Sequence, residues 1–249
     1  MGTLSVIIIS KNESKNIFDC VKSAAFADEV LVLDSGSNDN TAEIARSAGA
    51  TVLETDWPGY GPQKNRAIEA SKSEWLFSLD ADERISPTLA AEIRTAMNSG
   101  EFQVYDVPRS SKFVSKFMQH SGWWPDRTKR LFKRGTAQFT LHEVHEHLQS
   151  ELPTGHLNEP LIHFSYDNFE TVLDKMNRYS SGGAQELHKK GKNGSLSSAI
   201  MHGVWAFIRT YFLRAGFLDG REGFMLAVSN AEVTYYRYIK LYYLNLTKK

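Results

Sequence analysis

Asp80-Ala81-Asp82-Glu83 places three carboxylates within four residues, directly after the apolar residues 75–79. The apolar run predicts a short buried strand. Side chains two positions apart in extended chain point the same way, so Asp80 and Asp82 can reach one site. Like charges this close repel, which means that the fold must hold positive charge beside them. A hard divalent cation that bridges phosphate oxygens meets this need. A solvated turn after a strand is the alternative interpretation of an isolated Asp-Ala-Asp.

The elements that must position this cluster are strands that alternate with helices. Aliphatic and β-branched runs predict buried strands at residues 4–9, 29–33 and 75–79, and a further strand at residues 50–54. Helical spacing of apolar residues predicts helices at residues 16–26 and 42–48. Such alternation produces right-handed βαβ units and a parallel sheet. In these sheets ligands bind beyond the carboxyl ends of the strands, where the chain has polar clusters at residues 10–13, 34–39 and 80–83.

The common nucleotide-binding motifs are absent from this layout. No G-x-G-x-x-G follows a strand, and the sequence contains no Walker A motif. We therefore expect a metal ion, rather than a glycine-rich loop, to hold the phosphates. Asp34, at the tip of the second strand, can accept a hydrogen bond from a base or a ribose. An Asx-turn at the start of the loop is the alternative role for this residue.

The composition is that of a globular protein whose 249 residues can form one large core or two small ones. Lys and Arg together number 29, as do Asp and Glu, so no overall charge favours binding of nucleic acid. Cys20 is the one cysteine, which excludes an internal disulfide and fits a reducing compartment. Residues 4–9 are too short for the apolar region of a signal peptide. We expect a cytoplasmic protein.

Four motifs together resemble the family 2 glycosyltransferases of the GT-A fold. In chain order they are Ser10-Lys11-Asn12-Glu13; Asp34-Ser35-Gly36-Ser37 with Asp39 and Thr41; Gln63-Lys64-Asn65-Arg66-Ala67; and Asp80-Ala81-Asp82-Glu83. The resemblance covers residues 4 to about 165 and is specific, because the motifs come in the family's order and spacing. It implies an α/β GT-A domain, Rossmann-like and nucleotide-sugar-binding, at residues 1–165. Residues 166–249 would form a C-terminal helical extension.

The resemblance also implies roles for individual residues. Asp34 would bind the base of a nucleotide-sugar donor, Asp80 the ribose, and Asp82 with Asp80 an Mg²⁺ or Mn²⁺ ion. Lys64 or Arg66 would lie near the base or the diphosphate. The other donor-binding residues implied by the motifs are Ser10, Asn12, Glu13 and Ser35.

A second cluster of chemical groups lies at residues 141–147, Leu-His-Glu-Val-His-Glu-His. It misses the zinc-protease motif H-E-x-x-H because Glu146 occupies the second histidine position. Sugar transfer needs a base that takes the proton of the acceptor hydroxyl. In the lipopolysaccharide-core branch of the family, Val-His-Glu follows an Arg-Leu-Phe strand, as Val144-His145-Glu146 follows Arg130-Leu131-Phe132 here. We predict Glu146 as the catalytic base and Glu143 as the second candidate. Pairing of these carboxylates with the arginines of residues 127–134 is the alternative.

Residues 109–134 mix basic and aromatic side chains, which suits a phosphorylated or glycosylated acceptor. A solvated charged face is the alternative, and nucleic acid conflicts with the neutral overall charge. The predicted acceptor-binding residues are Trp123, Trp124, Arg127, Arg130 and His145.

The C-terminal part predicts a helix at residues 168–188, a polar loop at 189–197 and further helices rich in aromatic and basic residues. No apolar run approaches the roughly 20 residues that span a bilayer. Helices of this kind lie in a membrane interface, or pack on the domain, or form a dimer. We predict peripheral contact with the cytoplasmic face of the inner membrane.

Together these features predict an inverting, metal-dependent glycosyltransferase. The branch of the family implies UDP-glucose as donor and a lipopolysaccharide-core or similar glycolipid as acceptor. Transfer to a polyprenyl phosphate is a second enzymatic hypothesis. A non-catalytic sugar-nucleotide-binding subunit is a third.

Overall fold

The computed structural model describes residues 2–141 and 146–246, which fall into two compact units. Unit 1 comprises Met1–Arg109 and Asp126–His163, and unit 2 comprises Ser110–Pro125 and Phe164–Lys249. Residues 110–125 therefore belong with the C-terminal helices, although they lie within the span expected for the first domain. The division into folding domains at residue 165 stays a prediction.

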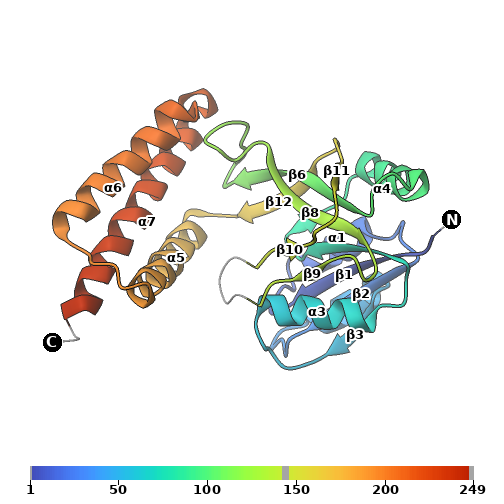
Figure 1. The fold of residues 1–249 in the computed structure, drawn as a ribbon. Helices are drawn as coiled ribbons and strands as arrows, with labels where there is room; N and C mark the ends of the chain where they lie inside the picture. Colours follow the sequence, from blue (N-terminus) through green and yellow to red (C-terminus); the bar gives the residue numbers. More distant parts are fainter. Residues whose placement is uncertain (1, 142–145, 247–249) are drawn as a thin grey trace. The chain divides into compact units, whose positions relative to one another are not determined.

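Unit 1 is built on a mixed sheet with the strand order β3-β2-β1-β4-β8-β6-β12-β5 (Figure 1). The first four strands in this order are parallel, as predicted: β1 Leu4–Ser10, β2 Glu29–Asp34, β3 Thr51–Glu54 and β4 Trp75–Asp80. The next four bring antiparallel pairing: β8 Asp126–Lys133, β6 Val104–Phe113, β12 Leu161–Tyr166 and β5 Glu83–Arg84. Of the shorter strands, β11 Thr154–His156 pairs with β6, and β9 Gln138–Phe139 pairs with β10 Leu148–Gln149. Strand β7 Lys116–Phe117 belongs to unit 2 and pairs with the end of β6.

Helices cover both faces of the parallel strands. Val6 and Ile8 of β1 share one apolar cluster with α1 Ile17–Ser23, α2 Thr41–Ala48 and α4 Pro87–Ser99. Ile7 and Ile9 share the other cluster with α3 Tyr60–Ala70. Because successive side chains of a strand point to opposite faces, a strand covered on both sides is apolar at most positions, and in β1 only Ser5 and Ser10 are polar. All seven residues of β1 are buried.

The strand register brings together the polar residues at the carboxyl ends of the parallel strands. Ser10 is the partner of Asp34 between β1 and β2, and Ile9 is the partner of Asp80 between β1 and β4. The carboxyl ends of three parallel strands thus meet at one edge of the sheet. This is the edge at which ligands bind in α/β sheets.

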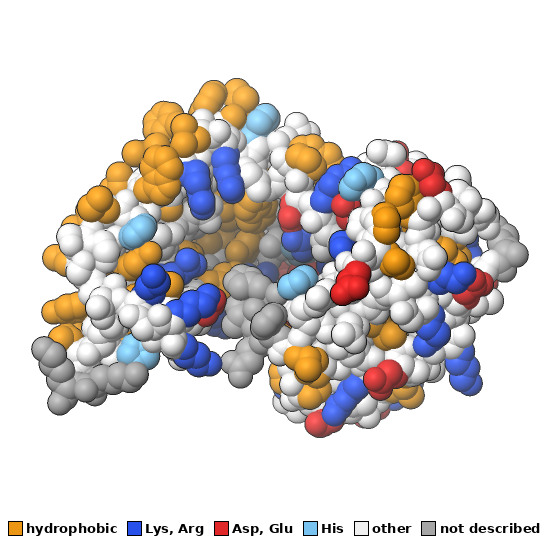
Figure 2. All heavy atoms as spheres, in the orientation of Figure 1, with side chains coloured by type: hydrophobic (Ala, Val, Ile, Leu, Met, Phe, Trp, Pro, Cys, Tyr) orange, Lys and Arg blue, Asp and Glu red, His pale blue; other side chains and the backbone are white. Residues whose placement is uncertain are grey.

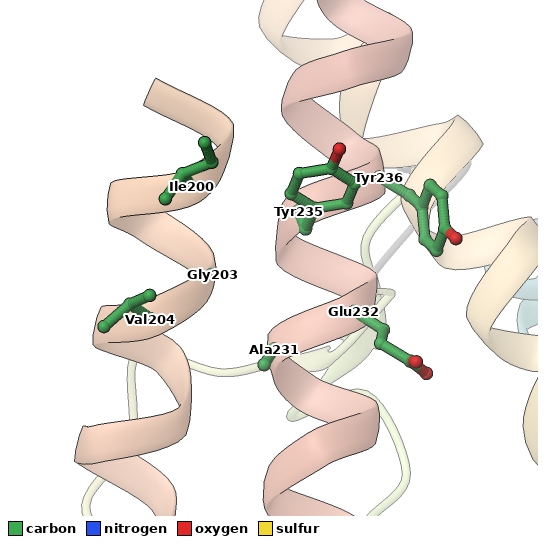
Figure 3. A pocket seen from close by; sticks show the side chains of 7 residues that line it. All are labelled: Ile200, Gly203, Val204, Ala231, Glu232, Tyr235 and Tyr236. Atoms are coloured by element: carbon green, nitrogen blue, oxygen red, sulfur yellow. The ribbon is translucent and has the colours of Figure 1, made fainter. Parts of the chain in front are cut away.

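Unit 2 is largely helical. Its helices are α5 Phe169–Lys189 and α6 Leu196–Ile208, a π-helical turn Arg209–Leu213, a 3₁₀ turn Gly216–Asp219, and α7 Arg221–Leu246. Helix α7 packs against both α5 and α6, and a groove of about 330 Å³ lies between α6 and α7 (Figure 3). Ile200 and Val204 line it from α6, and Tyr235 lines it from α7. No helix in the described ranges has the length and apolar character needed to cross a membrane.

Buried Asp219 fixes the 110–125 segment within unit 2. Its carboxylate accepts hydrogen bonds from the backbone N–H groups of Gln119 and His120, at 3.1 and 3.0 Å, and from the Ser121 hydroxyl at 3.2 Å. The side chain is 1% exposed. Because a buried carboxylate is stable only when it is well hydrogen-bonded, Asp219 has a structural role here.

Candidate active site

Arg130 supplies part of the positive charge that the three clustered carboxylates require. Its Nη2 atom lies 2.6 Å from Asp80 Oδ2 and 2.6 Å from Glu83 Oε1. Arg130 reaches them because β8 pairs with β4 in the sheet. The backbone N–H of Asp80 donates to Glu83 Oε2 at 2.9 Å. Glu83 and Arg130 are both buried, so the charges compensate one another inside the protein.

Lys64 supplies further positive charge from helix α3. Its Nζ atom lies 2.9 Å from Asp80 Oδ1 and 3.1 Å from Glu146 Oε1, and 5.1 Å from the centre of the Phe139 ring. The Lys64 side chain is only 6% exposed. One buried ammonium group therefore joins the carboxylate predicted to bind the donor to the carboxylate predicted to act as base.

These contacts set opposite protonation tendencies within the carboxylate cluster. Burial raises the pKa of Asp80, but the charges of Arg130 and Lys64 outweigh it and hold this pKa well below the usual range. Burial, reinforced by the charge of Asp80, raises the pKa of Glu83 despite Arg130. Burial also raises the pKa of the Cys20 thiol, whose Sγ contacts the Asp80 carbonyl oxygen at 3.4 Å. Of Asp80 and Glu83, Asp80 is thus the ionised residue, and Cys20 is an inert thiol beside it.

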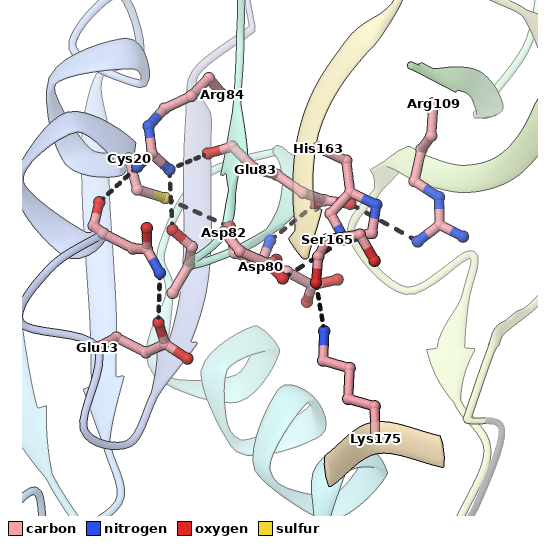
Figure 4. Close-up of polar contacts among 12 residues, drawn as sticks. Glu13, Cys20, Asp80, Asp82, Glu83, Arg84, Arg109, His163, Ser165 and Lys175 are labelled. Carbon is pink, nitrogen blue, oxygen red and sulfur yellow. Dashed lines mark hydrogen bonds and ion pairs between the residues drawn. The ribbon is translucent and has the colours of Figure 1, made fainter. Parts of the chain in front are cut away.

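Asp82 faces a histidine that the sequence analysis did not select. Asp82 Oδ2 lies 3.4 Å from His163 Nε2, and both side chains are partly exposed (Figure 4). His163 arrives here because β12 pairs with β5 and places His163 opposite Glu83. Residues 160–166, Pro-Leu-Ile-His-Phe-Ser-Tyr, also resemble the lipopolysaccharide-core branch of the family, and this resemblance is the sequence signal that could have found His163.

The donor set fits a hard divalent cation in part. Asp82 and Asp80 offer carboxylate oxygens, the ligand type that Mg²⁺ and Mn²⁺ prefer, and His163 offers an imidazole nitrogen beside them. Both oxygens of Asp80 already contact protein cations. Within residues 2–141 and 146–246, no group of three or more His, Cys, Asp or Glu side chains is arranged to hold a metal ion. Ligands from a bound diphosphate would have to complete such a site.

The predicted donor-binding residues gather at the ends of β1 and β2. Buried Asp34 accepts hydrogen bonds from Ser10 Oγ at 3.0 Å and from the backbone N–H of Ser37 at 2.8 Å. The second bond spans three residues, one more than the Asx-turn given as the alternative role for Asp34. Asn12 Oδ1 accepts from the backbone N–H of Asn38 at 2.8 Å, which ties the two loops together.

Three other donor-site predictions have distinct surroundings. Ser35 Oγ accepts from Gln63 Nε2 at 3.0 Å, which links this loop to α3. Glu13 Oε2 accepts from the Asn16 side chain at 2.9 Å. Arg66 pairs with exposed Asp56 at 2.6 Å, so of the two basic candidates on α3 the structure brings Lys64, not Arg66, to Asp80.

Two comparisons with known proteins decide the family. The sequence profile of the family described as Glycosyl transferase family 2 matches residues 5–148. An uncharacterized glycosyltransferase of Rickettsia prowazekii is 30% identical over 259 residues, which cover 99% of this chain and 89% of the relative. The chain belongs to glycosyl transferase family 2. Both the expected family and the expected α/β GT-A fold are thereby confirmed, and the protein is a glycosyltransferase.

This glycosyltransferase is also similar to proteins with more specific names. The lipopolysaccharide core biosynthesis glycosyltransferase LpsC of Rhizobium meliloti is 29% identical over 247 residues, which cover 96% of this chain and 92% of LpsC. Glucosyl-3-phosphoglycerate synthase from Mycobacterium tuberculosis is 26% identical in sequence. Its crystal structure is that of the complex with Mn²⁺, uridine diphosphate and glucosyl-3-phosphoglycerate. That similarity covers 46% of this chain and 45% of the other, with a TM-score of 0.38.

The predicted acceptor-binding residues of the glycosyltransferase are divided between the two units. Arg127 pairs with Asp106 at 2.6 Å in unit 1. Trp123 stacks on Tyr166 in unit 2, with ring centres 5.9 Å apart, and Trp124 is exposed. Buried Arg130 pairs with Asp80 and Glu83, and its contact with an acceptor stays a prediction. His145 and the alternative base Glu143 lie outside the described residues.

Proposed function

We propose that this glycosyltransferase moves a sugar, with inversion, from UDP-glucose or a similar nucleotide sugar to a lipopolysaccharide-core or related glycolipid. The observation that carries the proposal is the Asp80–Lys64–Glu146 network, at 2.9 and 3.1 Å, because it sets a donor-site carboxylate beside a candidate base. Similarity to LpsC over nearly the whole of both chains supports the acceptor class.

Asp82, Asp80 and His163 are the residues that would hold Mg²⁺ or Mn²⁺. When bound, the ion supplies Lewis-acid stabilisation of the negative charge on the leaving diphosphate. The chain's own cations act on Asp80: Arg130 and Lys64 keep it ionised, and so keep it able to bind a ribose hydroxyl or a cation. Asp34 and Ser10 shape the neighbouring loop, where the base of the nucleotide would bind.

Glu146 is the proposed general base. Its carboxylate would take the proton of the acceptor hydroxyl while that oxygen bonds to the anomeric carbon. The bond from the anomeric carbon to the diphosphate oxygen breaks in the same step, and the electron pair leaves with the nucleoside diphosphate. A single displacement of this kind inverts the anomeric centre. General-base catalysis typically contributes about 10²–10⁴ in rate.

We further propose that an apolar surface of unit 2 contacts the membrane that carries the acceptor, on the cytoplasmic face of the inner membrane. We call it the α6 surface, and it consists of the exposed side chains of Ile200, Met201, Val204, Trp205, Phe212, Leu213, Phe217 and Leu218. Hydrophobic side chains gather over α6 in the space-filling view (Figure 2). Exposed Arg209, Arg214 and Arg221 lie in the same stretch of chain, whereas its one acidic residue, Asp219, is buried.

This combination favours an anionic bilayer as the partner of the α6 surface. An interfacial helix gains free energy from apolar burial and from attraction of nearby Lys and Arg to anionic headgroups. The sequence of α6 contains no Asp, Glu, Lys or Arg, so no charge on α6 itself opposes insertion. A second copy of the chain is the rival partner, and the liposome experiment described below distinguishes the two.

The decisive test of the donor proposal is a thermal-shift panel of nucleotide sugars with and without Mg²⁺ or Mn²⁺. A ligand present at 100 times its Kd stabilises the folded protein by about 2.7 kcal/mol. We expect UDP-glucose to raise the Tm only when the divalent ion is present. Transfer to polyprenyl phosphate would be favoured if that acceptor, and no core glycolipid, were glycosylated. Donor binding with neither transfer nor hydrolysis would support a non-catalytic subunit.

A further inference from the structure

Asn65 clamps helix α3 to strand β9 through both halves of its side-chain amide. Asn65 Nδ2 donates to the carbonyl oxygen of Phe139 at 2.9 Å, and Asn65 Oδ1 accepts from the backbone N–H of Phe139 at 2.8 Å. A side-chain amide that satisfies both backbone groups of one residue fixes the position of that residue relative to the helix. None of the roles proposed above uses Asn65.

Gly61, one turn earlier on α3, allows β9 to approach so closely. A Cβ atom at position 61 would lie 1.9 Å from the carbonyl oxygen of Thr140, a distance that no side chain tolerates. The backbone after β9 therefore rests directly on the helix at Gly61. Gly61 and Asn65 stand four positions apart, and so lie on one face of α3.

The same strand leads to the proposed base. Phe139 pairs with Leu148 of β10. Beyond that pair, the Thr140 N–H donates to the His147 carbonyl oxygen at 3.1 Å, and the His147 N–H donates to Thr140 Oγ1 at 3.2 Å. Glu146 directly precedes His147, and its carboxylate contacts Lys64, the neighbour of Asn65 on α3. The backbone and the side chain of Glu146 are thus both held in place by contacts that lead to helix α3.

We propose that Asn65 is a positioning residue for Glu146. It acts through the hydrogen-bonded series Asn65–Phe139–Thr140–His147. These contacts hold the backbone of Glu146 in the position from which its carboxylate contacts Lys64. The inference rests on the proposed role of Glu146 as general base. Misplacement of a reacting group by about 1 Å can cost about 10²-fold in rate, so loss of the clamp should reduce turnover without touching the donor.

The test compares Asn65→Ala and Asn65→Asp with the wild-type enzyme. Alanine has the higher helix propensity, so α3 itself is not weakened by the first change. With UDP-glucose and a core glycolipid we expect kcat of Asn65→Ala to fall about 10- to 100-fold while the donor KM stays unchanged. Asn65→Asp keeps the acceptor for the Phe139 N–H but turns a carboxylate oxygen toward the Phe139 carbonyl oxygen, so its kcat should also fall below that of the wild type. Asn158→Ala removes an exposed amide that bonds Glu92, and serves as the matched control.

Two further measurements separate positioning from a general loss of structure. Amide hydrogen exchange of Phe139, Thr140 and His147 should be faster in Asn65→Ala, while exchange in β1 and β4 stays as in the wild type. In the Glu146→Gln background, Asn65→Ala should cause almost no further loss of kcat, because there is no base left to misplace. Wild-type kcat in Asn65→Ala, or losses that multiply in the double variant, would overturn the proposal. Wild-type kcat in Glu146→Gln alone would instead refute the base assignment.

Discussion

Lys64 Nζ and Glu146 Oε1 lie 3.1 Å apart, although the two residues are 82 positions apart in the sequence. The same ammonium group lies 2.9 Å from Asp80, which ends strand β4 and begins the carboxylate cluster. A charge-assisted contact of this kind is about twice as strong as a neutral hydrogen bond. Its geometry connects the side of the site that would bind the donor to the side that would activate the acceptor.

Lys64→Met should therefore weaken both functions at once. It removes the shared charge and retains most of the apolar stem in a site that is 6% exposed. A hydrogen bond to a charged group contributes about 1.5–3 kcal/mol, which corresponds to a loss of about 10- to 100-fold in kcat/KM. Steady-state kinetics with varied donor measures it, and exposed Lys72→Met is the control. An unchanged kcat/KM would show that the network has no catalytic importance.

Asp82→Ala should abolish the divalent-ion-dependent increase in Tm caused by UDP. The fold should remain intact, because removal of one of several clustered carboxylates relieves repulsion. Titration of Mn²⁺ in the presence of UDP, followed by differential scanning fluorimetry, provides the measurement. His163→Ala should weaken the response in the same direction, and exposed Asp174→Ala should leave it unchanged. A full metal response in Asp82→Ala would refute the metal assignment.

Asp80→Asn should change the pH dependence of stability in a defined direction. The folded-state pKa of Asp80 is lowered, so its ionisation stabilises the fold above the unfolded pKa of about 3.9. That stabilisation is lost as the pH falls through the folded-state pKa. Near pH 7 the variant should be about 1–3 kcal/mol less stable than the wild type, and the difference should shrink below about pH 4.

Urea unfolding at a series of pH values, followed by tryptophan fluorescence, measures this difference. Glu83 is present in both proteins, so the comparison isolates Asp80 and its coupling to Glu83. A difference that stays constant to pH 3, or that grows in acid, would mean that Asp80 is not held ionised by Arg130 and Lys64.

Replacing Met201, Val204 and Trp205 together by Ser should reduce binding to anionic liposomes at least about tenfold. All three side chains are more than half exposed, so unit 2 should still fold. Their insertion would contribute apolar burial, and each nearby Arg adds about 1 kcal/mol that salt weakens. Flotation with vesicles containing phosphatidylglycerol, at low and high salt, measures this binding, and Phe18→Ser in unit 1 is the control. If the wild type ignores liposomes but is a dimer that the triple variant dissociates, the α6 surface is a protein interface.

Three strands of the parallel half, β1, β2 and β4, could be predicted because they are largely buried and therefore form nearly continuous apolar runs. Asp80 and Asp82 could be selected because their charges demand compensation. The partners could not be predicted. Arg130 meets Asp80 through the pairing of β8 with β4, and His163 meets Asp82 through the pairing of β12 with β5. No local pattern specifies these long-range pairings.

The long-range contacts of helix α3 also could not be predicted from the local sequence. Its motif Gln63-Lys64-Asn65 indicated a donor-binding element, and Gln63 does contact Ser35. The contacts of Lys64 with Glu146 and of Asn65 with Phe139 depend on how β9 packs on the helix. The sequence alone left Lys64 and Arg66 as equal candidates, and tertiary packing separates them.

The most direct test of the proposed mechanism is the turnover of Glu146→Gln with UDP-glucose, Mn²⁺ and a core glycolipid acceptor. The change is nearly isosteric and removes the proton acceptor, so we expect kcat to fall by about 10²–10⁴ while the Tm increase caused by the donor stays as in the wild type. Exposed Glu151→Gln should retain full activity. Wild-type kcat in Glu146→Gln would contradict the mechanism and would place the base elsewhere, with Glu143 as the next residue to replace.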